Sequence, residues 1–400
     1  MPSLTDYLNA LTIDEIEADP YPLYARLRDE APVAYVPALN SYLVTRWADV
    51  QTVTKSPERF TAHAPDAPVV RAFGDPAIIH CDGDIHSHLR GGIAPHYLPA
   101  KVRDYIAALV EPIADDALEQ LTGATKTDLL AHYFEPISVQ SLARSFGIDS
   151  VSTDTLREWF HGLALGAINF GRDPERARQC QDTIDAINHA LDPVFERLYQ
   201  THDESPLSHL LRIGMPEGAL RAREEVMPTV LVTLLGGMQE PGHAAATTLY
   251  ALLADPPQLD AVRADRSLLP QAIDEGLRWV APIGTQVRTA VEDTELGGVT
   301  LKAGDTVSAV IASACHDESR YTDPARFDLH RKDGGHAAFG FGAHLCVGKW
   351  FAKAQVEIAL NRLLDHYPTL TLNGEVQFNG WEFRAPQSLP VRLSTPGHTG

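Results

Sequence analysis

The sequence predicts a mainly α-helical protein with small β-sheets, an α+β fold formed by one domain over residues 1–400. Three observations support this prediction. Residues 101–265 carry a mostly helical pattern that proline and glycine interrupt. Short segments with alternating or β-branched residues lie near both ends of the chain. No internal repeat, low-complexity stretch or Ser/Gly linker divides the sequence, so we expect one domain.

The predicted elements follow in a simple order. A proline turn after Asp19 starts a short helix, and two extended segments at 34–37 and 41–45 form a predicted hairpin. The long helical region comes next. Strand-like segments return late in the chain, at 298–301, 306–311 and 389–393. We therefore expect a large helical body with small sheets near both ends.

Composition and charge exclude several classes of protein. The chain is 44% hydrophobic and carries 33 Lys+Arg against 53 Asp+Glu, a net charge of −20, which disfavours nucleic acid as a partner. No uncharged apolar run reaches the roughly 18 to 20 residues that span a bilayer, so no membrane is expected. The N-terminus lacks the features of a signal peptide. The four cysteines form no CxxC pair, so we expect a cytoplasmic protein with reduced thiols.

One cysteine lies in a glycine-rich segment near the C-terminus. Residues 339–348 read Phe-Gly-Phe-Gly-Ala-His-Leu-Cys-Val-Gly and precede a long amphipathic helix. Cys346 is therefore expected at a helix N-terminus, where amide N–H groups and the helix dipole stabilise a thiolate. The glycines let the backbone approach a flat, bulky group. Such a thiolate suits an axial iron ligand, whereas a cysteine outside this context is more often part of the core.

The same segment carries a family signature. Phe339, Gly342, His344, Cys346 and Gly348 fit the pattern FxxGxHxCxG of haem-thiolate proteins, and the chain resembles a cytochrome P-450. The resemblance implies the P-450 fold, a single catalytic domain shaped like a triangular prism. It also implies haem b with Cys346 as the axial thiolate ligand of the iron and Phe339 beside the cofactor.

Other segments agree with this family in chain order. Glu275 and Arg278 match its ExxR element, and residues 324–328 resemble its PxRF element. The i,i+3 spacing places Glu275 and Arg278 on one helix face, where they can pair. The resemblance further implies that four residues neutralise the two haem propionates: His86, Arg90, Arg288 and His344.

The expected long helix over the haem, at 227–253, departs from the family pattern. Most members carry an acid–alcohol pair there that relays protons, and this chain has Gln239 and Glu240 instead. Pro241 has no N–H and clashes with the carbonyl four residues back, and two glycines precede it. The helix is therefore expected to kink or open at this point, although a purely structural kink is the simpler alternative.

Glu240 suggests the identity of the oxidant. A carboxyl group can take a proton from one oxygen atom and return it to another. Hydrogen peroxide already carries the two electrons and two protons that dioxygen must otherwise receive. We therefore predict that the protein uses hydrogen peroxide directly, with Gln239 and Glu240 as catalytic residues.

The run from Gly236 to His243 resembles a narrower group, the bacterial O-demethylases of lignin-derived methoxyphenols. Residues 73–79, 276–279 and 380–386 resemble that group as well. The resemblance implies a small apolar pocket for one substituted ring. Its expected lining is Phe73, Ile79, Ala167, Val232, Leu235, Gly236, Ile283, Val287 and Phe383.

Ala167 suggests which ring is bound. A gapless alignment places it where guaiacol-type members carry a bulky Phe, although Phe170 lies three residues further on and makes the register of this alignment ambiguous. An alanine leaves room for a second ortho substituent, which favours syringol (2,6-dimethoxyphenol) over guaiacol. The expected reaction hydroxylates the methoxy carbon, and the resulting hemiacetal collapses to a catechol-type product and formaldehyde.

Three alternatives stay open at this point. The nearest is a conventional P-450 monooxygenase of another small aromatic substrate, supplied by a flavin or iron–sulfur reductase that docks on Lys101, Arg103, Lys349 and Lys353. A fatty-acid peroxygenase needs a guanidinium above the haem, and the central helix supplies none. A haem sensor or carrier is disfavoured by the open, glycine-lined helix.

Overall fold

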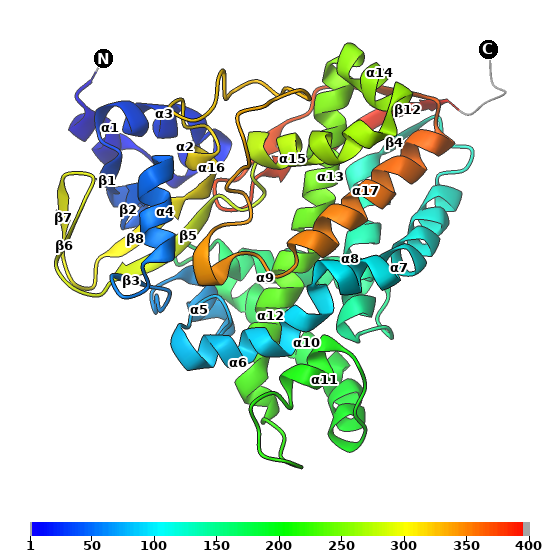
Figure 1. The fold of residues 1–400 in the computed structure, drawn as a ribbon, viewed down its shortest axis with the longest axis horizontal. Coiled ribbons are helices and arrows are strands. Elements are labelled where there is room, and N and C mark those ends of the chain that lie inside the picture. The colour runs from blue at the N-terminus through cyan, green and yellow to red at the C-terminus, as the bar shows by residue number, and fades with distance from the viewer. Residues whose placement is uncertain (1, 395–400) are drawn as a thin grey trace.

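The computed structural model describes residues 2–394. Its outline is broad along the edge that carries α1, α14 and β12 and narrows towards α10 and α11 (Figure 1). Helices dominate, and four small sheets contain the strands of the described residues. This agrees with the predicted mainly α-helical fold. Within residues 2–394, no helix is both long and apolar enough to cross a membrane.

The N-terminal quarter packs on a five-stranded sheet. The strand order is β1-β2-β8-β5-β3, in which β2 and β8 run parallel and the other neighbours run antiparallel. The predicted hairpin is confirmed, with Val33 opposite Val44 and Val36 opposite Ser41. The elements of this region are α1 (Leu4–Ala10), α2 (Ile13–Ala18), α3 (Tyr21–Glu30), β1 (Val33–Val36), β2 (Ser41–Val44), α4 (Trp47–Lys55), β3 (Phe60–Thr61), β5 (Thr285–Ala290), β6 (Thr294–Leu296), β7 (Val299–Leu301), β8 (Thr306–Val310) and α16 (Ile311–Ala314).

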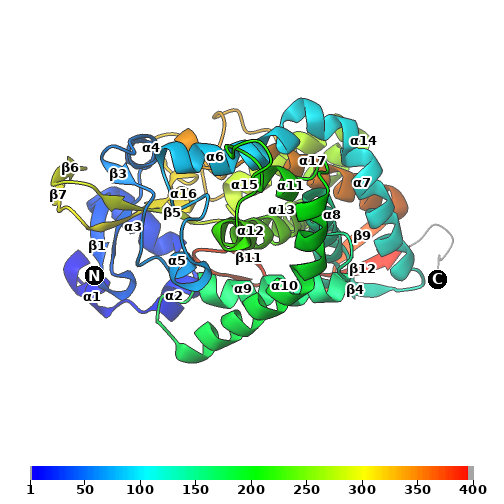
Figure 2. The same cartoon turned by 90° about the horizontal axis from the view of Figure 1, so that it is seen from below.

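The helical body surrounds the larger of two hydrophobic clusters, and the sheet and the N-terminal helices enclose the second. Helices α9 and α10 lie side by side along one edge of the molecule (Figure 2). The body consists of α5 (Pro68–Phe73), α6 (Gly83–Ile93), α7 (Pro99–Gln120), α8 (Glu135–Phe146), α9 (Thr153–Ala167), α10 (Pro174–Gln200), α11 (Pro206–Leu210), α12 (Arg223–Met238), α13 (Glu240–Ala254), α14 (Pro256–Ala264), α15 (Leu269–Trp279) and α17 (Lys349–His366).

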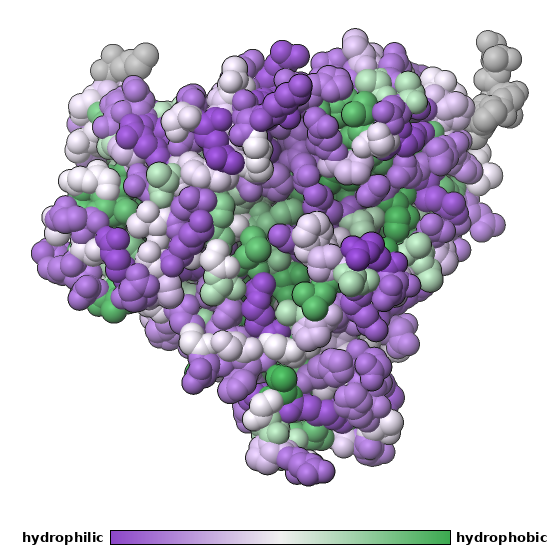
Figure 3. Space-filling model, viewed as in Figure 1, coloured by the Kyte–Doolittle hydropathy of each residue, from purple (hydrophilic) through white to green (hydrophobic). Residues whose placement is uncertain are grey.

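Short strands close the C-terminal part. β12 (Pro390–Ser394) pairs with β9 (Thr369–Leu372) and with β4 (Lys126–Asp128), which lies inside the region predicted as mostly helical. A second pair, β10 (Phe378–Asn379) and β11 (Ala385–Pro386), ends in a tight turn beside β5. On the face seen in Figure 3, hydrophobic side chains gather near the N-terminal end of α17. The site described next begins at that end.

Candidate active site

A cavity of about 340 Å³ lies inside the molecule, between the segment before α17, strand β5 and helices α12 and α13. The wall is mostly apolar, and it includes side chains from segments far apart in the chain. Of the residues predicted from the sequence, those on the wall are Ile79, His86, Arg90, Ala167, Val232, Leu235, Gly236, Glu240, Ile283, Val287, Arg288, Phe339, His344, Cys346 and Phe383. Sequence motifs separated by hundreds of residues thus meet at one place.

Cys346 belongs to this wall. All four cysteines lie in the described residues, and Cys346 is the exposed one, since it faces the cavity. Its backbone N–H donates to the carbonyl of Phe339 at 2.9 Å, which closes the glycine-rich loop. Gly342 has φ +69, and a Cβ there would lie 2.7 Å from the Thr54 carbonyl oxygen, so the loop requires glycine at this position.

The expected start of the following helix needs a correction. α17 begins at Lys349 with Gly348 as its N-cap residue, so Cys346 precedes the helix. Its exposed surface faces the internal cavity, so desolvation still raises the pKa of the Cys346 thiol, and the backbone N–H of Gly348 opposes that shift without reversing it. The predicted stabilisation of the thiolate by a backbone amide is therefore present, but desolvation of the sulfur outweighs it in the protein without a bound metal. Binding to a metal cation deprotonates a thiol directly.

Cationic side chains line one part of the cavity. Arg288 donates to the Val287 carbonyl at 2.7 Å, while its Nη2 is buried with no partner in the described chain. His86 Nε2 is also buried without a partner there, and the His86 and His344 rings lie 4.2 Å apart. Burial lowers the pKa of Arg288 to about 10. Buried polar nitrogens of this kind need a hydrogen-bond partner, and the charged guanidinium of Arg288 favours an anionic one.

Arg90 and His344 already have protein partners. Arg90 Nη2 donates to the Leu345 carbonyl at 2.8 Å, which joins α6 to the cysteine loop. His344 Nε2 lies 3.0 Å from Asp82 Oδ1. Burial on its own would raise the pKa of Asp82, but hydrogen bonds from His344 and Thr61 lower it. Asp82 was not predicted from the sequence, where a single aspartate carries no motif.

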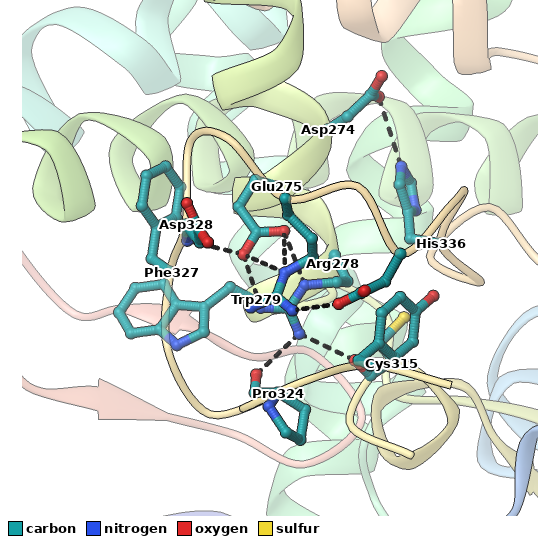
Figure 4. A network of polar contacts seen from close by, with 12 residues as sticks. Asp274, Glu275, Arg278, Trp279, Cys315, Pro324, Phe327, Asp328 and His336 are labelled. Carbon is teal, nitrogen blue, oxygen red and sulfur yellow. Dashed lines mark hydrogen bonds and ion pairs between the residues drawn. The ribbon is translucent and has the colours of Figure 1, made fainter. Parts of the chain in front are cut away.

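The Glu275–Arg278 pair is confirmed and lies at the centre of a buried network (Figure 4). Arg278 Nε lies 2.7 Å from Glu275 Oε2, and the exposed fractions of the two side chains are 2% and 4%. Arg278 also donates to the carbonyls of Cys315, Pro324 and Arg326. A second guanidinium, that of Arg331, lies 3.0 Å from the same carboxylate, and no sequence motif marks this residue. The network ties α15 to the long segment that leads to the cysteine loop.

The predicted break in the central helix is confirmed. α12 ends at Met238 and α13 begins at Glu240, with Gln239 between them. Both carboxyl oxygens of Glu240 are buried without a hydrogen-bond partner among residues 2–394, and burial raises its pKa well above the usual value. Glu240 lies on the cavity wall. Gln239 does not, and its Oε1 is buried without a partner in the same range.

Phe73 is the other residue that the structure places off the wall. It is 5% exposed and belongs to the larger hydrophobic cluster, whereas Pro68 and Val69 of the same helix do line the cavity. Four residues advance a helix by about 6 Å, which carries Phe73 past the cavity. Ala167 and Phe170 both line the wall, and Phe170 packs on Trp381 with ring centroids 5.0 Å apart.

One expected docking residue is not free. Lys353 Nζ lies 2.6 Å from Asp274 Oδ1, and Figure 4 shows Asp274 with its contact to His336. Lys349 lies over the ring of Trp350, which is 42% exposed. The predicted basic patch therefore loses one of its four charges to a local ion pair. Polar wall residues that sequence reasoning did not single out are His80, Thr233, Thr285, Gln286 and Glu382, although Glu382 lies in the segment 380–386 that resembles the O-demethylases.

A cysteine, an arginine and a histidine, the last two with unpartnered buried nitrogens, on the wall of one apolar cavity are the residues expected of a haem-thiolate site. Comparisons with known proteins agree. The family model "Cytochrome P450" matches residues 173–379. Cytochrome P450 monooxygenase PikC of Streptomyces venezuelae is 30% identical over 392 residues, covering 94% of this chain and 92% of the relative. 6-Deoxyerythronolide B hydroxylase of Saccharopolyspora erythraea is 29% identical over 404 residues, with 96% and 98% covered.

Solved structures share the whole architecture. The ligand-free structure of cytochrome P450 TbtJ1 has a TM-score of 0.82 at 29% identity and covers 95% of this chain and 99% of its own. CalO2 has a TM-score of 0.85 at 24% identity, which shows the fold alone. The chain belongs to the cytochrome P450 family and is a P450 monooxygenase that binds haem b through an axial cysteine thiolate.

The residues of the cavity fit this cofactor. The unpartnered Nη2 of Arg288 and Nε2 of His86 suit the two carboxylates of haem b, and Cys346 presents its sulfur to the same space. The wall between them is apolar, as a porphyrin ring requires.

Proposed function

We propose that this P450 removes the methyl group of a methoxyphenol, with syringol favoured and guaiacol as a second substrate, and that it accepts hydrogen peroxide directly. The observation that carries the proposal is Glu240, a buried carboxyl without a protein partner on the wall that also holds Cys346. In the overall reaction a methoxyphenol and hydrogen peroxide give the catechol-type product, formaldehyde and water.

Each part of the wall has an assigned role in this proposal. Cys346 is the axial ligand, Phe339 packs beside the cofactor, and the propionates are bound by His86, Arg90, Arg288 and His344. Haem b with a thiolate ligand supplies the oxidising chemistry, and the thiolate favours cleavage of the O–O bond. The protein supplies position, dryness and protons.

Glu240 is proposed to transfer a proton within the oxidant. Burial raises the pKa of this carboxyl well above its usual value, which favours the neutral form. A neutral carboxyl donates a proton through one oxygen and accepts one through the other, so it can pass a proton between the two oxygen atoms of hydrogen peroxide. Gln239 lies off the wall next to Glu240, and we assign it a positioning role rather than contact with the oxidant.

The substrate pocket has apolar sides that suit one aromatic ring. Ile79, Leu235, Ile283, Val287 and Phe383 supply the surface, and the main-chain groups of Val232 and Gly236 are proposed to orient the phenol hydroxyl. Ala167, which is 2% exposed, leaves space that a larger side chain would fill. This space supports the preference for syringol, which has a second ortho methoxy group.

The test measures formaldehyde released from syringol and guaiacol by the purified ferric protein with hydrogen peroxide and no reductase. Rapid release that Glu240→Gln lowers by about 10²-fold supports the proposal, since loss of a general acid–base group costs 10²–10⁴-fold. Glu224→Gln, an exposed carboxyl at the start of α12, is the matched control and should leave the rate unchanged. Release that needs NADH and a reductase would favour the conventional monooxygenase instead.

A further inference from the structure

Glu382 is a cavity-wall carboxyl that the proposed reaction does not use. It lies in the turn between β10 and β11, next to Phe383. The Thr285 hydroxyl donates to Glu382 Oε2 at 2.5 Å, and both residues line the cavity. This is the one hydrogen bond that the carboxyl makes to residues 2–394, so Oε1 remains free to bind a molecule in the cavity.

The turn that carries Glu382 is held rigidly against strand β5. Gly284 N–H donates to the Glu382 carbonyl at 2.7 Å, and Ile283 pairs with Phe383 in a β-bridge. A Cβ on Gly284 would lie 1.9 Å from the Trp381 carbonyl oxygen, so the backbones touch there. A polar group supported in this way is held in place before a ligand arrives, as a specific contact requires.

The chemistry of the carboxyl selects its ligand. Burial raises the pKa of Glu382 to about 7, with the Thr285 bond opposing the shift and the charge of Glu17 adding to it. Both forms of the carboxyl are therefore present at neutral pH. A hydroxyl group can donate to the ionised form and accept from the neutral form, whereas a ligand carboxylate is repelled by the ionised form.

The position of Glu382 separates it from the other polar contacts. Val232 and Gly236, which are proposed to bind the phenol hydroxyl, belong to α12, whereas Glu382 and Thr285 belong to the strand side of the wall. The ligand contact at Glu382 is therefore made to a different part of the substrate. The residues proposed to bind the propionates, His86, Arg90, Arg288 and His344, lie on other elements than Glu382.

We propose that Glu382, held by Thr285, recognises a hydroxyl-bearing substituent of the aromatic substrate and selects against a carboxylate at that position. The inference deepens the proposed function, because it defines the substituted ring that the pocket prefers. An aromatic ring with an alcohol side chain is the class of substrate that satisfies both polar contacts.

The experiment measures dissociation constants by calorimetric and Soret-band titration of the haem-containing protein. The matched ligands are 4-hydroxymethyl-2,6-dimethoxyphenol and its 4-methyl analogue, tested on the wild type, Glu382→Leu and Glu382→Gln. In the wild type we expect the hydroxymethyl ligand to bind more tightly than the methyl ligand. The ratio of the two dissociation constants should fall about tenfold in Glu382→Leu and by less in Glu382→Gln, as expected for the loss of one hydrogen bond. Glu375→Gln changes an exposed carboxyl off the wall and should leave the ratio unchanged.

A second pair of ligands separates this inference from the proposed function. 4-Methylbenzyl alcohol and para-xylene carry neither a methoxy nor a phenol group. If the methoxyphenols fail to bind but this pair keeps a ratio that depends on Glu382, the inference stands and the proposed substrate is wrong. If the methoxyphenols bind and the ratio is the same in the wild type and Glu382→Leu, the inference is wrong and the substrate stands.

If Glu382→Leu does not fold, the proposal is tested by the affinity of Glu382→Gln for a ligand that carries a 4-carboxylate. Removing the ionisable group removes the repulsion, so Glu382→Gln should bind 4-carboxy-2,6-dimethoxyphenol about tenfold more tightly than the wild type at pH 8. An unchanged affinity for the carboxylate in this variant would overturn the proposal.

Discussion

Two glutamate–arginine pairs in this chain share their spacing and differ in burial, which allows a controlled prediction. Glu275–Arg278 and Glu175–Arg178 are both i,i+3 helix pairs with a shortest N···O distance of 2.7 Å. The first pair is 4% and 2% exposed, and the second 57% and 59%. Glu275→Gln removes one carboxylate from two buried guanidiniums, those of Arg278 and Arg331.

The size of the effect follows from this burial. Breaking a buried pair by removing one partner costs about 3–5 kcal/mol, because a charge stays buried without compensation. The entropy of unfolding is about 2.1 cal/mol/K per residue, or roughly 0.8 kcal/mol/K for this chain, so the midpoint should fall by about 4–6 °C. Glu175→Gln should leave the midpoint unchanged, because exposed pairs are screened by solvent.

Thermal unfolding followed by circular dichroism and by haem release measures both variants. The network ties α15 to the segment before the cysteine loop, so haem release should accelerate in Glu275→Gln along with the loss of stability. Equal shifts in the two variants would show that burial does not decide the effect. A midpoint for Glu275→Gln within the scatter of the wild type would refute the reasoning.

Three further predictions concern the cavity. Gly237→Ala should destabilise the fold by about 1–3 kcal/mol, because its Cβ would lie 2.7 Å from Leu142, whereas a Cβ on Gly236 has its nearest such neighbour at 3.9 Å; urea unfolding compares the two variants. Ala167→Phe should weaken syringol binding by about tenfold or more and spare guaiacol, measured by Soret titration; equal losses would contradict the assignment of this space. Burial raises the pKa of Glu382 from 4.5 to about 7, so the folded chain keeps a proton that the unfolded chain has released. Stability falls as pH rises through that window, and Glu382→Gln should reduce the slope of the urea midpoint against pH; an unchanged slope would show that the carboxyl is ionised throughout.

Local chemistry explains which parts were predictable from the sequence. Pro241 lacks an N–H, so a break in the central helix followed from one residue, and the helix does end at Met238. The loop before α17 was predictable because glycines and a cysteine at fixed spacing carry a signature. Glu275 and Arg278 were predictable as neighbours, since a helix places i and i+3 on one face.

The parts that were missed depend on contacts between distant segments. Arg331 reaches Glu275 from 56 positions away in the chain, and no local pattern marks it. Asp82 meets His344 in the same way. Strand β5 was not predicted, because pairing with β8 and β3, rather than its own short sequence, holds it in the sheet. Phe73 was placed on the wall by alignment, which does not fix how far along a helix the cavity extends.

The helix break and the buried glutamate are physically connected. Where α12 stops and α13 starts, the normal ladder of backbone hydrogen bonds is interrupted, and Pro241 cannot restore it. Glu240 is the first residue of α13, so its position beside the cavity is a consequence of that interruption. A carboxylate is costly to bury at this point, and burial therefore raises the pKa of Glu240 and favours its neutral form. The same interruption therefore places a buried carboxyl without a protein partner on the wall that also holds Cys346, and the proposed use of hydrogen peroxide rests on this feature.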